Sequence, residues 1–207
     1  MTGKFRKTTI VVASLVLLLI VTTAVIVSIW PTQEESFFEL GLLGKDKSAD
    51  SYFSGSNSTV DVGDTNGWFI FVHNHMNQKQ NIIVKVKLLN STMTLPDDKT
   101  NQPSNVASFV SFPLSLSLNQ TMLVPFYWNV IKAETYNGSI NIKSLVVNEQ
   151  VVNVSVSASV HSSFRIVFEL WVQDPVSGEY RFGWQSKDNF SSISLNIGFK
   201  LGEATAL

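Results

Sequence analysis

An uncharged run of 23 residues, Thr8–Trp30 (TTIVVASLVLLLIVTTAVIVSIW), constrains this chain more than any other feature. At the α-helical rise of about 1.5 Å per residue it spans roughly 35 Å, which is enough to cross a hydrocarbon core of about 30 Å. A helix of that length in a globular domain would carry a polar face, and this run has none. The run therefore predicts a transmembrane helix over residues 8–30.

The charges on either side of the run predict its orientation. Residues 1–7 hold three cations, whereas Glu34 and Glu35 follow the run. The positive-inside rule then makes residues 1–7 a cytoplasmic stub and places the rest of the chain outside. Residues 31–35 are expected to be a short spacer. The predicted location is the cell membrane, with an extracellular C-terminal domain of residues 36–201 and a tail of residues 202–207.

Two other interpretations of the run differ in how it is processed. A cleaved signal peptide has an apolar region of about 7–15 residues that ends at a small-x-small cleavage site. The run here is longer, and its end, Val25–Trp30, offers no such site. A pilin-type leader is cut after a short basic segment, and the apolar helix then polymerises. Arg6-Lys7-Thr8 lacks the small residue expected at that cut. A pilin-like filament subunit with a β head remains the alternative to the anchor.

Charge and cysteine content exclude several functions. Beyond the stub, 12 of the 15 cations remain against all 16 acidic residues, a net charge of −4. That balance is not the footprint of a nucleic-acid-binding protein. The chain has no cysteine, which excludes thiol catalysis, iron–sulfur clusters and cysteine-ligated zinc. An exported domain without disulfides depends on its hydrophobic core, and this chain is long enough to form one.

Asn-x-Ser/Thr sequons are frequent beyond the run. They can be glycosylated only outside the cytoplasm and on exposed backbone, in agreement with the predicted orientation. We expect some of the six to carry glycans: Asn57, Asn90, Asn119, Asn137, Asn153 and Asn189.

Alternation with a period of two residues runs through the exterior part. In Asn81–Leu89 the aliphatic residues share one face, while Lys85 and Lys87 point the other way. Phe164–Val172 repeats the pattern with Glu169 on the polar face. Such alternation predicts antiparallel strands with one face on a core and one in water. Further strands are predicted over Ser36–Leu43, Thr59–Val62, Trp68–Asn74, Met122–Val130, Ser139–Val147, Val152–Val160, Tyr180–Gln185 and Ser192–Leu201.

The predicted fold class is all-β, an Ig-like antiparallel β-sandwich that follows one N-terminal transmembrane helix. Many short strands joined by turns such as Asp174–Gly178 are typical of that architecture. Strands beyond about residue 138 either complete the first sandwich or form a small second sheet. Ser91–Asn105 (STMTLPDDKTNQPSN) has no periodicity and is expected to be a long, mobile surface loop.

Two segments resemble a known family. Ser36–His75 has a strand ending in Leu-Gly, a Tyr-containing link, the motif Val60-Asp61-Val62-Gly63 and a hydrophobic strand closing on Asn74-His75. Phe164–Phe182 (FRIVFELWVQDPVSGEYRF) resembles the closing hairpin of the same family. Both segments resemble those of a mostly archaeal family of membrane-anchored proteins. The family carries an uncharacterised Ig-like domain, the domain of unknown function 1616. The resemblance implies architecture and location, and no catalytic residues.

His73 and His75 form the most suggestive chemical pattern. Residues i and i+2 of a strand project to one face about 6.5–7 Å apart, a spacing that suits two imidazoles on one metal ion. A third ligand would come from His161, Asp61 or Asp64. The alternative is that His73 lies on an exposed face while His75 begins a turn. Metal binding is therefore the third functional hypothesis, and no cofactor is predicted.

Neither a nucleophile elbow (Gly-x-Ser-x-Gly) nor a phosphate-binding glycine loop occurs in the sequence, so no enzyme is predicted. The pair Asp97-Asp98 lacks the Asp-x-Asp spacing of calcium loops and is expected to be a solvated turn. Four aromatic residues could form a partner patch if they point outward, or core if they point inward. They are Trp171, Tyr180, Phe182 and Trp184.

The function expected from the sequence is that of a single-pass membrane-anchored, extracytoplasmic Ig-like module. It is expected to be non-enzymatic and to bind or stabilise another cell-envelope protein or a membrane complex. Nucleic acid is not an expected partner, and the sequence leaves the oligomeric state open.

Overall fold

The computed structural model describes residues 16–23, 25, 36–53, 58–186 and 189–202. The chain divides into two compact units, residues 1–34 and 35–207. In the first unit, residues 16–23 and 25 are helical. Among the described residues, no helix is both long and apolar enough to cross a membrane. The rest of the predicted transmembrane run, together with the stub, the spacer and residues 203–207 of the tail, lies outside the described residues.

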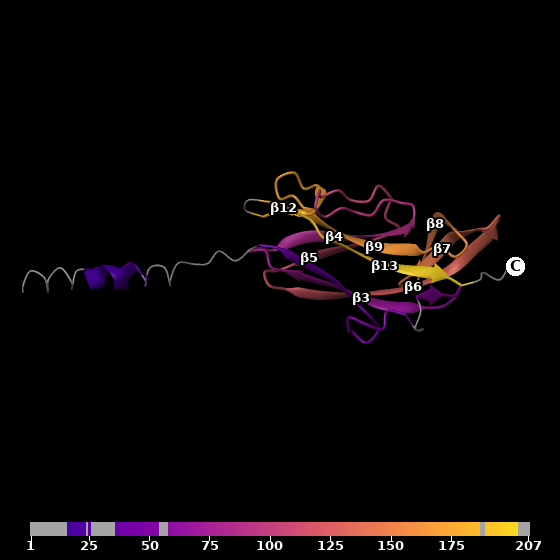
Figure 1. Ribbon diagram of the computed structural model, residues 1–207, viewed down its shortest axis with the longest axis horizontal. Coiled ribbons are helices and arrows are strands. Elements are labelled where there is room, and N and C mark those ends of the chain that lie inside the picture. The colour runs from indigo at the N-terminus through magenta and orange to yellow at the C-terminus, as the bar shows by residue number, and fades with distance from the viewer. Residues whose placement is uncertain (1–15, 24, 26–35, 54–57, 187–188, 203–207) are drawn as a thin grey trace, which may run out of the picture. The chain divides into compact units, whose positions relative to one another are not determined.

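The second unit is a sandwich of two β-sheets, whose layers Figure 1 shows one above the other. Sheet 1 has the strand order β1 (Phe38–Leu43), β3 (Asn66–Asn74), β6 (Thr121–Tyr136), β7 (Ser139–Val147) and β8 (Gln150–Ser159). Sheet 2 has the order β2 (Thr59–Val60), β13 (Ser194–Leu201), β9 (Phe164–Gln173), β4 (Gln80–Asn90) and β5 (Val110–Leu116). β10 (Tyr180–Phe182) also pairs with β9, and β11 (Trp184–Gln185) pairs with β12 (Phe190–Ser191). β13 and β2 pair in parallel, and the other pairings between these strands are antiparallel.

The core lies between the sheets and is rich in aromatic rings. Trp68 of β3 is fully buried against Trp128 of β6, with ring centroids 5.1 Å apart. Phe126 of β6 meets Phe168 of β9 edge to face at 5.4 Å, which joins the two layers. These side chains occupy alternate positions of their strands. The predicted all-β sandwich is therefore confirmed, because these strands bury one face in the core between the two sheets.

The sequence did not predict β5 (Val110–Leu116). Apolar residues alternate along this segment, but it contains Pro113, which counts against a strand and lies opposite Ile83 of β4. Proline has no backbone N–H to donate to a neighbouring strand, so a strand tolerates it only where the nitrogen points away from any partner strand. β5 is the last strand of sheet 2 and meets this condition.

Two predicted strands differ in length from the observed ones. β6 continues to Tyr136 instead of ending at Val130, and register shifts around Lys132 bend it against β7. The predicted strand Tyr180–Gln185 is divided by Gly183, whose φ of 97° is incompatible with a continuous strand. β7 and β8 extend sheet 1, the first of the two arrangements that the sequence left open.

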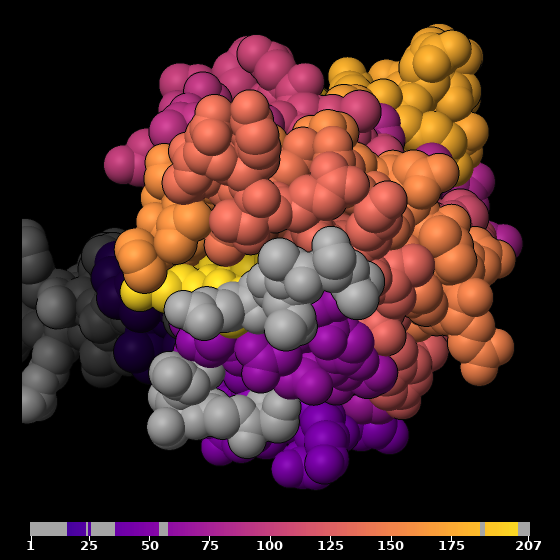
Figure 2. Space-filling view, turned by 90° about the vertical axis from the view of Figure 1, so that its right-hand side faces the viewer, coloured from indigo at the N-terminus to yellow at the C-terminus, as the bar shows by residue number. Residues whose placement is uncertain are grey.

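Tight two-residue turns join the last three strands of sheet 1. Asn137 and Gly138 connect β6 to β7 with φ of 48° and 73°, and Asn148 and Glu149 connect β7 to β8 with φ of 45° and 71°. Such turns have φ above zero at both central residues, because that geometry matches the twist of the strands. In Figure 2 the salmon and orange surface of this part of the chain lies above the purple surface of the earlier strands.

Candidate functional site

The two sheets differ in what covers their outer faces. The outer face of sheet 2 is overlaid by the connection between β4 and β5, the magenta loop in Figure 1. Lys87 and Glu169 are buried and bond to Ser104 of that loop. The side chain of Lys87 is 4% exposed and that of Glu169 is 0% exposed. The expectation that both residues face water is therefore wrong, because the loop between β4 and β5 removes this face from solvent.

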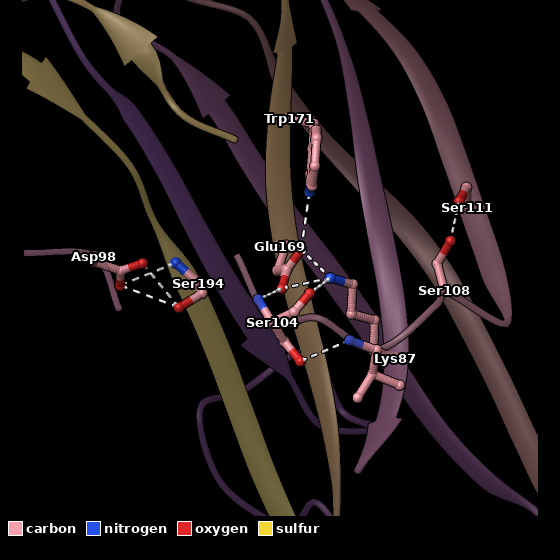
Figure 3. A network of polar contacts seen from close by, with 9 residues as sticks. Lys87, Asp98, Ser104, Ser108, Ser111, Glu169, Trp171 and Ser194 are labelled. Carbon is pink, nitrogen blue, oxygen red and sulfur yellow. Dashed lines mark hydrogen bonds and ion pairs between the residues drawn. The ribbon is translucent and has the colours of Figure 1, made fainter. Parts of the chain in front are cut away.

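The buried carboxylate of Glu169 is surrounded by hydrogen-bond donors (Figure 3). The Lys87 ammonium lies 2.9 Å from Oε1 and 2.8 Å from Oε2. The Ser104 N–H donates to Oε1 at 2.8 Å, and the Trp171 indole N–H donates to Oε2 at 2.9 Å. Lys87 also donates to the Ser104 carbonyl at 2.6 Å. Burying two charges costs several kcal/mol each unless such partners compensate, and here both charges have them.

A second lysine extends this network. The Lys85 ammonium lies 3.3 Å from the centroid of the Trp171 ring, a cation–π contact. Burial lowers the pKa of Lys85, the positive charge of Lys87 lowers it further, and Glu169 acts in the opposite direction. Because each charged group is matched by a neighbour, we interpret this network as structural.

The loop over sheet 2 is fixed at several points. The Asp98 carboxylate accepts a hydrogen bond from the Ser194 hydroxyl at 3.0 Å and another from its N–H at 3.2 Å. Asn101 donates to the Phe190 carbonyl at 3.3 Å. The structure therefore bears out a surface loop but shows Ser91–Asn105 tied to β9, β12 and β13, where a mobile segment was expected.

The acidic residues of this loop and of the β9–β10 turn are bonded locally. Hydrogen bonds from Thr100 and Lys99 hold the pKa of Asp97 below its ordinary value. The backbone N–H groups of Ser177 and Val176, followed by the charge of Arg181, lower the pKa of Asp174 in the same way.

The four aromatic residues considered as a partner patch do not form an exposed surface. Phe182 and Trp184 are buried, at 4% and 6% exposure. Trp171 and Tyr180 are partly buried. Trp171 lies between Lys85 and Glu169, and Trp184 donates to the Ser36 carbonyl at 3.2 Å. Gly183 turns the chain between Phe182 and Trp184, which places both in the interior.

His73 and His75 lie side by side, with ring centroids 4.0 Å apart. Phe37 stacks on the other side of His75 at 4.2 Å. His73 Nδ1 is 2.6 Å from the Thr121 hydroxyl, and His75 Nε2 is 3.1 Å from the Glu39 carboxylate. Since β3 runs between β1 and β6, these two contacts reach toward opposite sides. Over the described part of the chain, no group of three or more His, Cys, Asp or Glu residues is placed to hold a metal ion.

The sequons differ in accessibility. Asn119, Asn137, Asn153 and Asn189 are exposed, and they lie in three turns and on strand β8. The Asn90 side chain is partly buried. It donates to the Ser157 carbonyl at 2.7 Å and accepts from the Thr92 N–H at 2.9 Å. Asn57 lies outside the described residues.

The outer face of sheet 1 exposes apolar side chains from two adjacent strands, and we call it the open face. Register pairs bring Phe71 of β3 beside Leu123 of β6, and Phe69 beside Pro125. Leu123 is 39% exposed and Tyr127 is 47% exposed. The open face consists of Phe69, Phe71, Leu123, Pro125 and Tyr127.

Sequence reasoning missed the open face, although a signal was present. Met122–Val130 was predicted as a strand, and in it Leu123, Pro125 and Tyr127 alternate with the core residues Phe126 and Trp128. β6 is therefore apolar on both faces. Such a strand is expected either in the middle of a protein or on a surface that another molecule covers.

A cavity of about 490 Å³ opens where the open face meets the β7–β8 turn. Glu149 is the single charged residue among those that line it. The full lining is Thr65, Pro125, Tyr127, Trp128, Asn129, Val146, Asn148 and Glu149.

Comparison with known proteins defines no family for this chain. No family model matches it, and no curated protein matches it either. The resemblance to the domain of unknown function 1616 is therefore not confirmed.

Solved structures with some likeness to the chain include the CARDB domain of the PF1109 protein from Pyrococcus furiosus, in complex with di-metal ions. It is 10% identical, has a TM-score of 0.39, and the alignment covers 82% of this chain and 90% of that one. A β-glucosidase from Listeria innocua in complex with isofagomine is 11% identical with a TM-score of 0.35, and the alignment covers 81% of this chain but 16% of the enzyme. At this distance the likenesses assign neither a family nor an activity.

Proposed function

We propose that this protein is a single-pass membrane-anchored, extracytoplasmic β-sandwich of Ig-like type. In this proposal it is not an enzyme, and it binds another protein of the cell envelope through the open face. The observation that carries the proposal is the contrast between the two outer faces. The chain covers the outer face of sheet 2 with its own loop, whereas the open face presents apolar side chains to solvent. Contiguous exposed apolar surface marks interaction sites in soluble domains.

The helix supports a membrane anchor. Residues 16–23 make about two helical turns, and all of them are exposed, including Leu17 at 64% and Leu19 at 67%. Apolar side chains around the whole circumference favour lipid surroundings. The hydroxyls of Thr22 and Thr23 donate to the carbonyls of Leu18 and Leu19 at 2.9 and 2.7 Å, which satisfies them without water.

The polar groups of the domain support a non-enzymatic role. The buried carboxylate of Glu169 is neutralised by Lys87, and Asp174 pairs with Arg181 at 2.6 Å. Both pairs stabilise loops. The four exposed sequons agree with an extracytoplasmic location, because that is where such sites are modified.

Topology is tested by single-cysteine labelling of intact cells, which is clean because the chain has no cysteine of its own. Val176, at 95% exposure, is replaced by cysteine in one variant, and Thr2 in another. A membrane-impermeant maleimide should label Val176→Cys in intact cells and Thr2→Cys only after permeabilisation. Labelling of Thr2→Cys in intact cells would overturn the orientation. An intact mass that includes Met1–Lys7 would remove the pilin alternative.

Partner binding is tested by site-specific photocrosslinking in native membranes. A benzophenone amino acid replaces Leu123 on the open face, and Val176 serves as an exposed control on the β9–β10 turn. A discrete crosslinked product of constant mass is expected from position 123 and not from position 176. Equal products from both positions, or none from position 123, would contradict the proposed role of the open face.

A further inference from the structure

The cavity beside the open face has a rigid wall. Asn148 accepts a hydrogen bond from the Tyr127 N–H through Oδ1 and donates to the Pro125 carbonyl through Nδ2, both at 2.9 Å. Its own N–H donates to the Tyr127 carbonyl at 2.9 Å. These three bonds tie the β7–β8 turn to β6. This wall of the cavity is therefore fixed by two bonds from the Asn148 side chain and one from its backbone N–H.

Tyr127 contributes an aromatic platform to this wall. Its ring lies over Gly67 of the neighbouring strand, because a Cβ added at Gly67 would meet two ring carbons at 3.0 Å. One ring face thus covers the glycine backbone. The side chain nevertheless remains 47% exposed, which leaves aromatic surface for a ligand.

Asn129 also lies in the wall of the cavity. Its Oδ1 is buried and has no hydrogen-bond partner among the described residues.

Glu149 adds a negative charge at an unusual backbone position. Its φ of 71° is in the left-handed region, which glycine occupies readily and which residues with a Cβ atom avoid. The tight turn between β7 and β8 accounts for this geometry. Glu149 is the single charged residue in the lining of the cavity.

We propose that this cavity binds the guanidinium group of an arginine side chain presented by the partner protein. This inference rests on the proposed function and names the chemistry of its contact. A guanidinium stacks on an aromatic ring, pairs with a carboxylate and offers five donors and no acceptor. Tyr127 supplies the matching ring and Glu149 the matching charge. A neutral sugar would leave Glu149 without a countercharge, and an ammonium lacks the planar shape.

The test uses the full-length protein in detergent micelles with N-acetyl-arginine amide as the probe. Binding is followed by NMR through the side-chain amide of Asn129 and the ring of Tyr127. Because one side chain makes the contact, we expect saturation with a Kd of about 1 mM. N-acetyl-citrulline amide, which has the same shape without the charge, should bind at least about tenfold more weakly.

Two variants locate the site. Glu149→Gln and Tyr127→Leu should each weaken arginine binding about fivefold or more, while Glu134→Gln, an exposed glutamate of the same sheet, should leave it unchanged. Dispersed backbone NMR signals of each variant confirm that it is folded.

Three results would overturn this inference: equal binding of citrulline, saturable binding of glucose in place of arginine, or no saturable shift at Asn129. If photocrosslinking from position 123 succeeds while arginine fails, only the guanidinium inference falls. If photocrosslinking fails while arginine binds, the proposed function falls and the cavity remains a cation site.

Discussion

The Lys87 ammonium and the Glu169 carboxylate meet at 2.8 Å on the covered face of sheet 2, with 4% and 0% of their side chains exposed. They lie on adjacent strands, β4 and β9, and Ser104 of the overlying loop bonds to both. The pair therefore joins two strands and the loop in one network. It also explains why an otherwise polar loop stays on the sheet.

We expect the loss of either charge to be costly. Lys87→Met or Glu169→Gln should each lower the free energy of unfolding by about 3–5 kcal/mol, because the remaining partner is left without compensation. The double variant should lose less than the sum, since neither buried charge is then left without a partner. Urea denaturation of all four proteins measures the coupling.

The exposed contact between Lys143 and Glu134, at 3.6 Å, is the control for that cycle. Lys143→Met should change stability by less than about 1 kcal/mol, because solvent screens this pair. Additive losses at Lys87 and Glu169 would show that the network is not coupled.

The β9–β10 turn should respond to acid through Asp174. The pKa of its carboxyl is held below the ordinary 3.8 by the N–H groups of Ser177 and Val176 and by Arg181. A depressed folded-state pKa stabilises the protein above the unfolded value, and that contribution is lost as pH falls through the folded value.

We therefore compare wild type with Asp174→Asn, which resembles the protonated acid. The difference in denaturation midpoint should be present at pH 6, begin to shrink as pH falls below 3.8, and vanish in stronger acid. If the midpoints of wild type and Asp174→Asn still differ in strong acid, the effect of the substitution comes from the shape of the side chain and not from its charge.

Glycan occupancy should follow side-chain accessibility. In a host that glycosylates the protein, we expect Asn119, Asn137, Asn153 and Asn189 to be modified, since they are exposed. Asn90 should stay unmodified because its amide is engaged with Ser157 and Thr92. Mass spectrometry of peptides measures each occupancy. Modification of Asn90 together with absence at the four exposed sites would contradict the folded geometry.

Glu149→Gly should raise stability while removing the carboxylate of the cavity. Glycine accepts the φ of 71° without the penalty paid by a residue with a Cβ, so the free energy of unfolding should rise by about 0.5–1 kcal/mol. Gln150→Gly, one residue later in strand β8, should lower it by a similar amount. Thermal or urea denaturation checks both. Destabilisation by Glu149→Gly would show that the turn is not strained.

Local patterning predicted most of the strands because a period of two reports one buried face per strand. β1, β3, β4, β7 and β9 lie where alternation placed them. β5 was missed although its apolar residues alternate, because it contains Pro113 and only an edge position tolerates a proline in a strand. The burial of Lys87 and Glu169 was missed because a distant loop covers them, and alternation carries no information about what lies over a sheet.

The sequence by itself determined the all-β class of the domain, since alternating strands without an amphipathic helix to cover them bury their apolar faces by packing sheet against sheet. It also determined the apolar run and the sequons, because both are defined by the order of consecutive residues. Only the tertiary structure decided which faces are covered, because coverage depends on contacts between segments far apart in the chain. Register placed the partly buried Phe71 beside the exposed Leu123, and the loop over sheet 2 buried Lys87 and Glu169. The open face and its cavity exist because three strands and one turn meet there.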